Sequence, residues 1–184
     1  MSQAMNGMNE DTRKSVYRIL DASANRAGEG LRTMEEIARF VLDDSALTAE
    51  FKSQRHGLAG ALKSISRVSL LRARNTGEDV GTGITGTGEY LRANLADVVA
   101  AAATRTQQSL RVLEEYTKTI DSSISAELEQ VRYRCYTASA ALELCVVTHS
   151  ENCRLHSSCL YVLMSCGSSH DNFQAKVEEL LAGE

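Results

Sequence analysis

The stretch ANRAGEGLRTMEEIARF, residues 24–40, returns as ATRTQQSLRVLEEYTKT at residues 103–119, and this repetition decides the fold. A constant offset matches the charged positions of the two copies: Arg26 with Arg105, Arg32 with Arg111, and Glu35-Glu36 with Glu114-Glu115. After a short deletion the register resumes with Arg55 opposite Arg132. Self-similarity of this length indicates a duplicated structural unit.

Each copy lies within an amphipathic pattern that is typical of long helices. Small and apolar residues recur at spacings of three and four, which keeps them on one helix face. Four helices are expected, over residues 11–43, 45–73 and 87–120, and from the Asp121-Ser122-Ser123 stop to about Thr148. Asp44 or Ser45 is the expected cap of the second. The sequence therefore predicts an all-α bundle of about four long helices, built from a duplicated antiparallel hairpin with pseudo-twofold symmetry.

The last stretch of the sequence has a different character. Residues 159–165, CLYVLMS, form a short apolar run with β-forming residues, Gly167 interrupts it, and a capping-box pattern precedes an expected helix over 173–181. One strand and one helix cannot bury the strand, so this unit looks like the start of an incomplete α/β domain. The expected organisation is a helical domain at 10–148, a linker at 149–158 and a first βα unit at 159–184.

Composition excludes several classes of protein. The 184 residues are 43% hydrophobic and 24% charged, with no proline and a net charge of -4. This balance fits one soluble, helix-rich domain with an appendage, and it argues against a nucleic-acid-binding or membrane protein. The N-terminus lacks the pattern of a secretory signal, so a cytoplasmic location with reduced cysteines is expected.

Residues 81–86, GTGITG, spell a dinucleotide-binding pattern, but this pattern requires a preceding strand. Here a helix is expected before it, and residues 74–88 form a loop. The loop is either a flexible connector or a cover for a phosphate chain, using backbone N–H groups. For the second interpretation, the candidate phosphate-binding residues in and near the loop are Gly81, Gly83, Gly86, Arg55, His56 and Arg74, with Asp79 as a candidate Mg²⁺ ligand.

A polar stripe runs along the first helix and has a counterpart on the third. Its members are Asn25, Glu29, Arg32, Glu36 and Arg39, and the counterparts are Thr104, Gln108, Arg111, Glu115 and Lys118. The stripes are either solvated faces with ion pairs between successive turns or, if they face one another, the two walls of a cleft. Arginines can bind phosphate oxygens bidentately, and carboxylates can hold Mg²⁺, so such a cleft suits a phosphorylated ligand.

Histidines and cysteines near the C-terminus suggest a zinc site, which we disfavour. His149, Cys153, His156 and Cys159 have irregular spacings, and a thiol beside a strand commonly acts as a small hydrophobe. Cys135 and Cys145 are expected in the core.

The sequence resembles a known family in several long stretches. These are LDASANRAGEGLRTMEEIARFVLDD (20–44), the Arg55-His56 pair, ARNTGEDVGT (73–82), LADVVAAAATRTQQSLRVLEE (95–115) and VRYRCY (131–136). They are similar to the helical hydroxymethylpyrimidine phosphate kinase domain that precedes thiamin phosphate synthase in some bacteria. The resemblance covers roughly residues 14–145, and residues 159–183 look like the first strand and helix of the synthase (β/α)₈ barrel. The sequence departs from the family pattern at Gly28 and around Thr104.

The resemblance implies an enzyme of thiamin biosynthesis that uses ATP and Mg²⁺ to convert hydroxymethylpyrimidine phosphate into its diphosphate. The expected partners are these substrates and a synthase barrel in the same chain, with a homodimer as an open alternative. We expect Arg26, Arg32, Arg105 and Arg111 to be catalytic, Asn25 and Glu29 to bind substrate, and Glu36, Glu115 and Asp79 to bind Mg²⁺. The competing hypothesis is a catalytically silent helical module that dimerises or regulates the synthase barrel.

Overall fold

The computed structural model describes residues 7–84, 86 and 91–156, with side chains up to His149. The helices in these ranges are α2 (Glu10–Phe40), α3 (Ser45–Ala61), the 3₁₀ helix η1 (Leu62–Ser64), α4 (Arg67–Ala73), α5 (Leu95–Thr117) and α6 (Ser122–His156). No strand occurs in the described ranges, which confirms the all-α prediction there. The chain divides into two compact units, Met1–Ser150 and Glu151–Glu184.

The helix α2 and its turn into α3 follow the sequence signals closely. Asn9 caps α2, because its side chain accepts a hydrogen bond from the Thr12 backbone N–H at 2.7 Å. Asp43 adopts a left-handed backbone (φ 51°), and Asp44 then caps α3 by accepting from two backbone N–H groups at 2.9 Å. The predicted antiparallel hairpin and the cap at Asp44 are confirmed.

The predicted second helix is interrupted. The α-helix ends at Ala61, and Ile65 and Ser66 are extended before α4 begins. The Ser66 hydroxyl caps α4 by accepting from the Ser69 backbone N–H at 3.3 Å, while the Ile65 side chain is buried. Burial of Ile65 and the new cap outweigh the continuing apolar pattern, so α4 turns away and packs on α2.

The third helix begins later than the sequence predicts. Asn94 caps α5 by accepting from the Asp97 backbone N–H at 3.0 Å, and the Asp97 carboxylate accepts from the Ala93 backbone N–H at 2.9 Å. This reciprocal pair fixes the start at Leu95. Leu91 falls within the range predicted for this helix, but it precedes the helix and is exposed.

The last helix, α6, continues to His156, past the predicted end near Thr148 and into the predicted linker. The predicted strand at 159–165 and helix at 173–181 lie outside the described residues. None of the helices in the described part is both long and apolar enough to cross a membrane.

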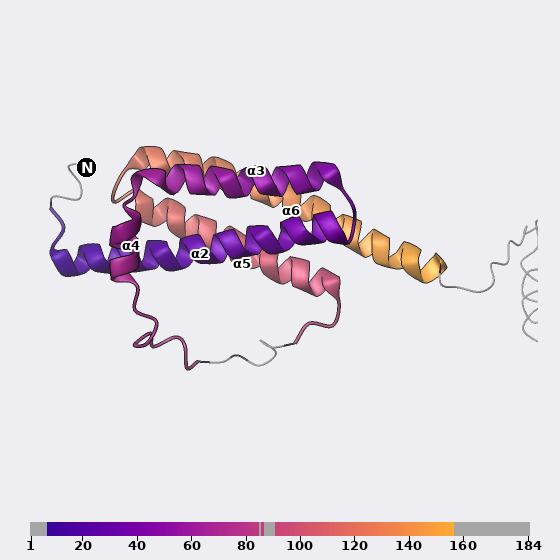
Figure 1. Ribbon diagram of the computed structural model, residues 1–184, viewed down its shortest axis with the longest axis horizontal. Helices are drawn as coiled ribbons and strands as arrows, with labels where there is room; N and C mark the ends of the chain where they lie inside the picture. Colours follow the sequence, from indigo (N-terminus) through magenta and orange to yellow (C-terminus); the bar gives the residue numbers. More distant parts are fainter. Residues whose placement is uncertain (1–6, 85, 87–90, 157–184) are drawn as a thin grey trace, which may run out of the picture. The chain divides into compact units, whose positions relative to one another are not determined.

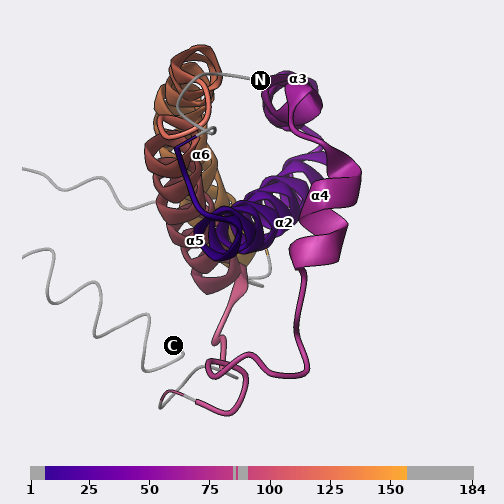
Figure 2. The same ribbon diagram turned by 90° about the vertical axis from the view of Figure 1, so that its left-hand side faces the viewer.

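The four long helices form an antiparallel bundle in which α2 and α5 lie side by side, with α3 next to α2 and α6 next to α5 (Figures 1 and 2). Their facing sides bury one apolar core that includes Leu31, Met34, Phe51, Leu110 and Leu128. α2 and α5 approach closely at Gly30, where an added Cβ atom would lie 2.0 Å from the Thr106 Oγ1 atom.

Candidate functional site

The duplication is visible as two equivalent clusters of charge. In the first, the buried Glu35 carboxylate accepts hydrogen bonds from Arg55 at 2.9 Å and Arg32 at 3.5 Å, and Arg32 also binds Glu36 at 2.8 Å. In the second, the corresponding residues repeat these contacts: Arg132 to Glu114 at 2.7 Å, Arg111 to Glu114 at 2.5 Å, and Arg111 to Glu115 at 2.8 Å. Each cluster ties the two helices of its hairpin together.

The two clusters differ in solvent access. The Arg132 side chain is 8% exposed and lies against the Tyr133 and Tyr136 rings, at 4.5 and 5.6 Å from their centroids. Burial alone would lower the pKa of Arg132, but hydrogen bonds to Glu114, Tyr136 and Tyr133 outweigh it and raise that pKa. The Arg55 side chain is 30% exposed, because His56 and Ala59 stand where the second repeat has tyrosines.

The hypothesis that the two stripes face one another requires these clusters to converge on one cleft. They do not converge. α2 and α5 are antiparallel (Figure 1). Residues that follow Gly30 on α2 and residues that follow Thr106 on α5 therefore lie toward opposite ends of the bundle. With a rise of about 1.5 Å per residue, Glu36 and Glu115 are about 20 Å apart along its axis. The interpretation of the stripes as ion-paired helix faces holds for Arg32, Glu36, Arg111 and Glu115.

The predicted metal ligands are also separated from one another. Glu36 pairs with Arg32, and Glu115 pairs with Arg111 and Lys118; the pKa of Glu115 is lowered, first by its hydrogen bond from Lys118. Asp79 lies in the loop, where its carboxylate accepts from the Gly81 backbone N–H at 2.9 Å. No group of three or more acidic, histidine or cysteine side chains suited to a metal ion occurs among the described residues.

The first part of the loop is fastened to α2. Arg74 donates two hydrogen bonds to the Asp21 carboxylate, at 2.7 and 2.8 Å, which raises the pKa of Arg74. One turn earlier on α2, Arg18 donates to the Asn75 carbonyl at 2.9 Å and lies 3.7 Å from the Asp79 carboxylate. The predicted residues Arg74 and Asp79 therefore position the start of the loop. The loop follows a helix, so the dinucleotide pattern at 81–86 lacks the strand that it requires.

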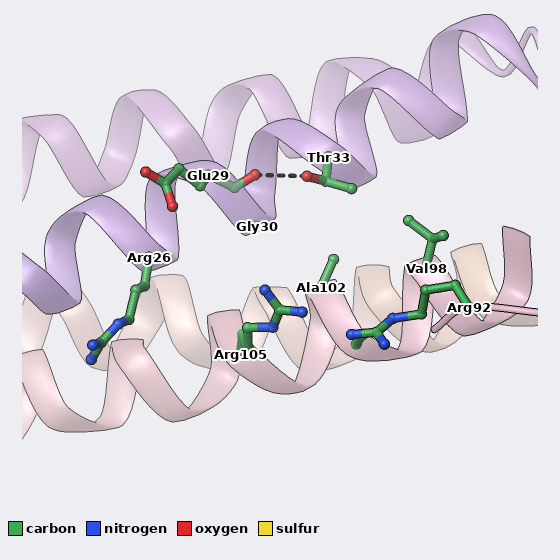
Figure 3. Close-up of a pocket in the computed structure, with 9 residues that line it drawn as sticks. Arg26, Glu29, Gly30, Thr33, Arg92, Val98, Ala102 and Arg105 are labelled. Carbon is green, nitrogen blue, oxygen red and sulfur yellow. Dashed lines mark hydrogen bonds between the residues drawn. The ribbon is translucent and has the colours of Figure 1, made fainter. Parts of the chain in front are cut away.

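A cavity of about 240 Å³ lies between α2 and α5, and it contains the repeat partners Arg26 and Arg105 (Figure 3). The other lining residues are Glu29, Gly30, Thr33, Arg92, Val98, Ala101 and Ala102. Figure 3 shows Arg105 rising from α5 into the space between the helices, with Arg26 reaching from α2 and Arg92 standing near the start of α5. The duplication thus contributes one arginine from each half to a single cavity.

The charges of this cavity are available to a ligand. Arg26, Arg105 and Glu29 are exposed, and in the described part of the chain their charged groups form no ion pair with each other or with another residue. Arg32, Arg55, Arg74 and Arg111 all hold carboxylates instead. Arg26 and Arg105 against Glu29 give the cavity a net positive charge, which suits an anion.

The remaining predicted residues are dispersed. Asn25 and His56 are exposed on α2 and α3, and neither lines the cavity. Gly81, Gly83 and Gly86 are exposed loop residues outside the cavity lining. The half-buried Gly28 and the exposed Thr104 lie on helices and are not in the lining either. Cys135 is buried as predicted, and burial raises the pKa of its thiol to about 12. Cys145 is exposed, so its placement in the core was wrong. The side chains of Cys153, His156 and Cys159 lie outside the described residues.

Sequence reasoning missed Arg92, Gly30 and Thr33 as members of the site. Arg92 precedes α5 in a stretch that we expected to be helical, and nothing in its neighbourhood marks it as a ligand. A signal for the other two was present, because small residues at positions 30, 101 and 102 beside the repeated arginines permit a close helix crossing.

Comparison with known proteins matches residues 18–141 to the ThiD2 family. Three thiamine-phosphate synthases are similar over most of this chain: that of Rhodopirellula baltica is 48% identical over 169 residues, that of Synechocystis 39% over 176, and that of Nostoc punctiforme 38% over 174. These alignments cover 91%, 96% and 95% of this chain but only 45%, 48% and 46% of the relatives. The chain spans about half the length of the curated relatives it matches. No solved structure matches it.

Proposed function

Because the chain belongs to the ThiD2 family, and its curated relatives place it in thiamine biosynthesis, we propose that it is a hydroxymethylpyrimidine phosphate kinase. The reaction is the transfer of the ATP γ-phosphoryl group to the phosphate of the pyrimidine, which yields the diphosphate. In a longer protein of the kind represented by its relatives, this region would supply the diphosphate to the synthase portion.

The observation that carries the proposal is the pair of repeat-related arginines in one cavity. Arg26 and Arg105 come from equivalent positions of the two halves, and among the described residues no carboxylate neutralises either of them. At about 240 Å³ the cavity is smaller than the roughly 300–1,000 Å³ typical of pockets for drug-sized ligands. It therefore suits the phosphate-bearing end of a ligand that extends beyond it.

The chemistry needs few specialised groups. The accepting oxygen belongs to a phosphate that is already anionic at neutral pH, so no general base has to deprotonate it. The protein must offset the repulsion between two phosphorylated molecules and stabilise the charge on the transferring group. In the proposal, Arg26 and Arg105 do this by binding phosphate oxygens, with Arg92 beside them in the cavity lining. Arg55 and Arg132 hold the two hairpins together through Glu35 and Glu114.

Mg²⁺ fits this donor set in a restricted way. Of the described residues that line the cavity, Glu29 is the one with a carboxylate. Mg²⁺ in phosphoryl-transfer sites is commonly held by one or two carboxylates together with phosphate oxygens and water. Bound in this way beside Glu29, Mg²⁺ would neutralise phosphate charge. Glu36, Glu115 and Asp79 remain predictions as ligands, and their separation favours Glu29.

The test is an assay of the purified chain with ATP, Mg²⁺ and hydroxymethylpyrimidine phosphate, in which ADP and the diphosphate are quantified by chromatography. Wild type should form both products in equal amounts. Arg26→Ala and Arg105→Ala should each lower kcat/KM by about 100-fold or more, because each removes a charged donor to phosphate. Arg67→Ala removes an exposed arginine on α4, outside the cavity, and should leave turnover unchanged.

Each alternative outcome has a separate meaning. A folded wild type that forms no product refutes the kinase and leaves the silent-module hypothesis, which also predicts no affinity for ATP. Product formation that survives Arg26→Ala and Arg105→Ala retains the kinase but places its site elsewhere. In that case the more open arginine cluster at Arg55 is the next to replace.

A further inference from the structure

The helix α6 carries two apolar stripes on opposite sides. The inner stripe is buried in the bundle and consists of Ile124, Leu128, Val131, Cys135, Ala138, Leu142 and Val146. The second, which we call the outer stripe, consists of the exposed residues Tyr133, Tyr136, Ala140, Leu144 and Val147. Its spacings of three and four keep these residues on one face. Helices that are apolar on both sides are normally covered on both, so the outer stripe indicates a contact that one bundle alone does not make.

A groove beside the outer stripe provides a complementary shape. It has a volume of about 530 Å³ and lies between α3 and α6, with walls of Ala46, Leu47, Tyr133, Thr137, Ala138 and Ala141. The Glu50–Arg134 ion pair, at 2.8 Å, borders it. The groove adjoins the N-terminal part of the outer stripe. The C-terminal part of the stripe carries the protruding side chains Leu144 (70% exposed) and Val147 (47% exposed).

We propose that the outer stripe and this groove form the interface of a symmetric antiparallel dimer of this chain, with Ala140 at the twofold axis. The order of residues along α6 is self-complementary about Ala140: Tyr136 and Leu144 lie four residues on either side, and Tyr133 and Val147 seven. When two copies of α6 cross antiparallel at Ala140, Leu144 and Val147 of each copy lie over the tyrosines and groove of the other. The same patch then serves both copies, as twofold symmetry requires. The small side chain of Ala140 permits close approach of the helices at the centre.

The surface area that the two copies would bury sets the expected affinity of the dimer. A half-exposed large side chain carries about 100 Å², so the four large residues of the outer stripe bury roughly 800 Å² in a symmetric pair. Thr137, Ala140 and the groove walls extend this toward the roughly 1,200 Å² of a small stable interface. The dimer is therefore expected to dissociate in the micromolar range. This inference does not depend on the proposed kinase activity.

The first test measures molar mass by sedimentation velocity, with total chain concentration varied from about 1 to about 200 µM. Wild type should pass from monomer to dimer over this range. Leu144→Glu should remain monomeric, because it places a charge within the apolar interface. Val68→Glu introduces the same charge at an exposed aliphatic residue of α4 and should dimerise like wild type. Circular dichroism verifies that all three chains are folded.

The second test locates the axis. In a Cys145→Ser background, Ala140→Cys should form an intermolecular disulfide under mild oxidation, with the cross-linked peptide identified by mass spectrometry. Ala126→Cys introduces a thiol on the same side of α6 but about 40 Å from its symmetry mate in this arrangement, so it should not cross-link. A monomer at every concentration, a dimer that survives Leu144→Glu, or equal cross-linking at both positions would overturn the proposal. The first of these outcomes would leave the outer stripe to a different segment of a longer chain.

Discussion

Gly30 determines how closely α2 and α5 approach. A Cβ atom at this position would lie 2.0 Å from Thr106 Oγ1 and 3.0 Å from the Ala102 carbonyl oxygen. Gly30→Ala should therefore lower the free energy of unfolding by about 1–3 kcal/mol, the usual cost of overpacking. Gly28→Ala is the matched control, because nothing lies within 4 Å of an added Cβ there. That change should stabilise the helix by about 0.5–1 kcal/mol. Urea denaturation of both variants measures the change in the free energy of unfolding. Equal changes in the two variants would show that the helix crossing at Gly30 is looser than described.

The two buried glutamates should respond differently to replacement. Glu114→Ala leaves the Arg132 guanidinium, whose side chain is 8% exposed, without its carboxylate, and a cost of about 3 kcal/mol is expected. Glu35→Ala leaves Arg55, which is 30% exposed and can be solvated, so the cost should be at least about 1 kcal/mol smaller. Chemical denaturation measures the difference. An equal cost in both repeats would mean that the tyrosines beside Arg132 do not affect its solvation.

At the scale of elements, the loop after α4 depends on a few tethers. Arg74 binds the Asp21 carboxylate with two hydrogen bonds and Arg18 binds the Asn75 carbonyl, so the start of the loop is fixed to α2. Arg74→Ala should increase the rate of limited proteolysis within residues 74–84 by several-fold. The midpoint of global unfolding should shift little, because the Arg74 side chain is 43% exposed. Arg67→Ala, at the start of α4, serves as control. Unchanged cleavage would show that Arg18 alone holds the loop.

Element boundaries show where sequence reasoning succeeds and where it fails. Local signals fixed the ends correctly where a side-chain cap stands alone, as with Asp44 at the start of α3. They failed at Ile65 and Ser66, where burial of one side chain competes with a continuing helical pattern. They also failed at α5, because the apolar spacing of Leu91 and Leu95 continues across Asn94, which nevertheless ends the pattern by capping. In both failures local capping hydrogen bonds, joined at Ile65 by burial of the side chain, outweighed a periodic preference.

At the scale of the whole molecule, the duplication predicted the bundle and the pairing of its halves. The same repeat also contained the candidate site, since Arg26 and Arg105 are repeat partners. The repeat does not predict which residues of one helix face the neighbouring helix. The crossing at Gly30 decides this, and it separates Arg26 and Arg105 from the ion-paired Arg32 and Arg111.

Acid should destabilise the bundle through its paired carboxylates. The pKa of Glu50 is lowered from 4.5, first by its hydrogen bond from Arg134, and that of Asp121 is lowered from 3.8, first by its hydrogen bond from Ser123. A lowered pKa in the folded state contributes stability above the unfolded value, and this contribution is lost as pH falls through the folded value. The free energy of unfolding should thus be insensitive to these groups at pH 5–7 and decline below about pH 4.5.

Glu50→Gln isolates one part of this acid response. It removes the ion pair between α3 and α6, which is partly exposed, and should cost no more than about 1 kcal/mol at pH 7. The difference from wild type should shrink as pH falls below about 4. Denaturation curves from pH 2.5 to 7 provide the comparison, and a difference that stays constant with pH would exclude the ion pair as its source.

The cavity between α2 and α5 takes one wall from each sequence repeat, so a bound ligand is a non-covalent cross-link between the two hairpins. Its binding free energy adds directly to the cohesion of the halves, by RT ln(1 + [L]/Kd). Amide protection on ligand binding should consequently rise together on two helices that are distant in the chain. Without the ligand, the two hairpins would therefore separate more readily from one another than in the ligand-bound protein.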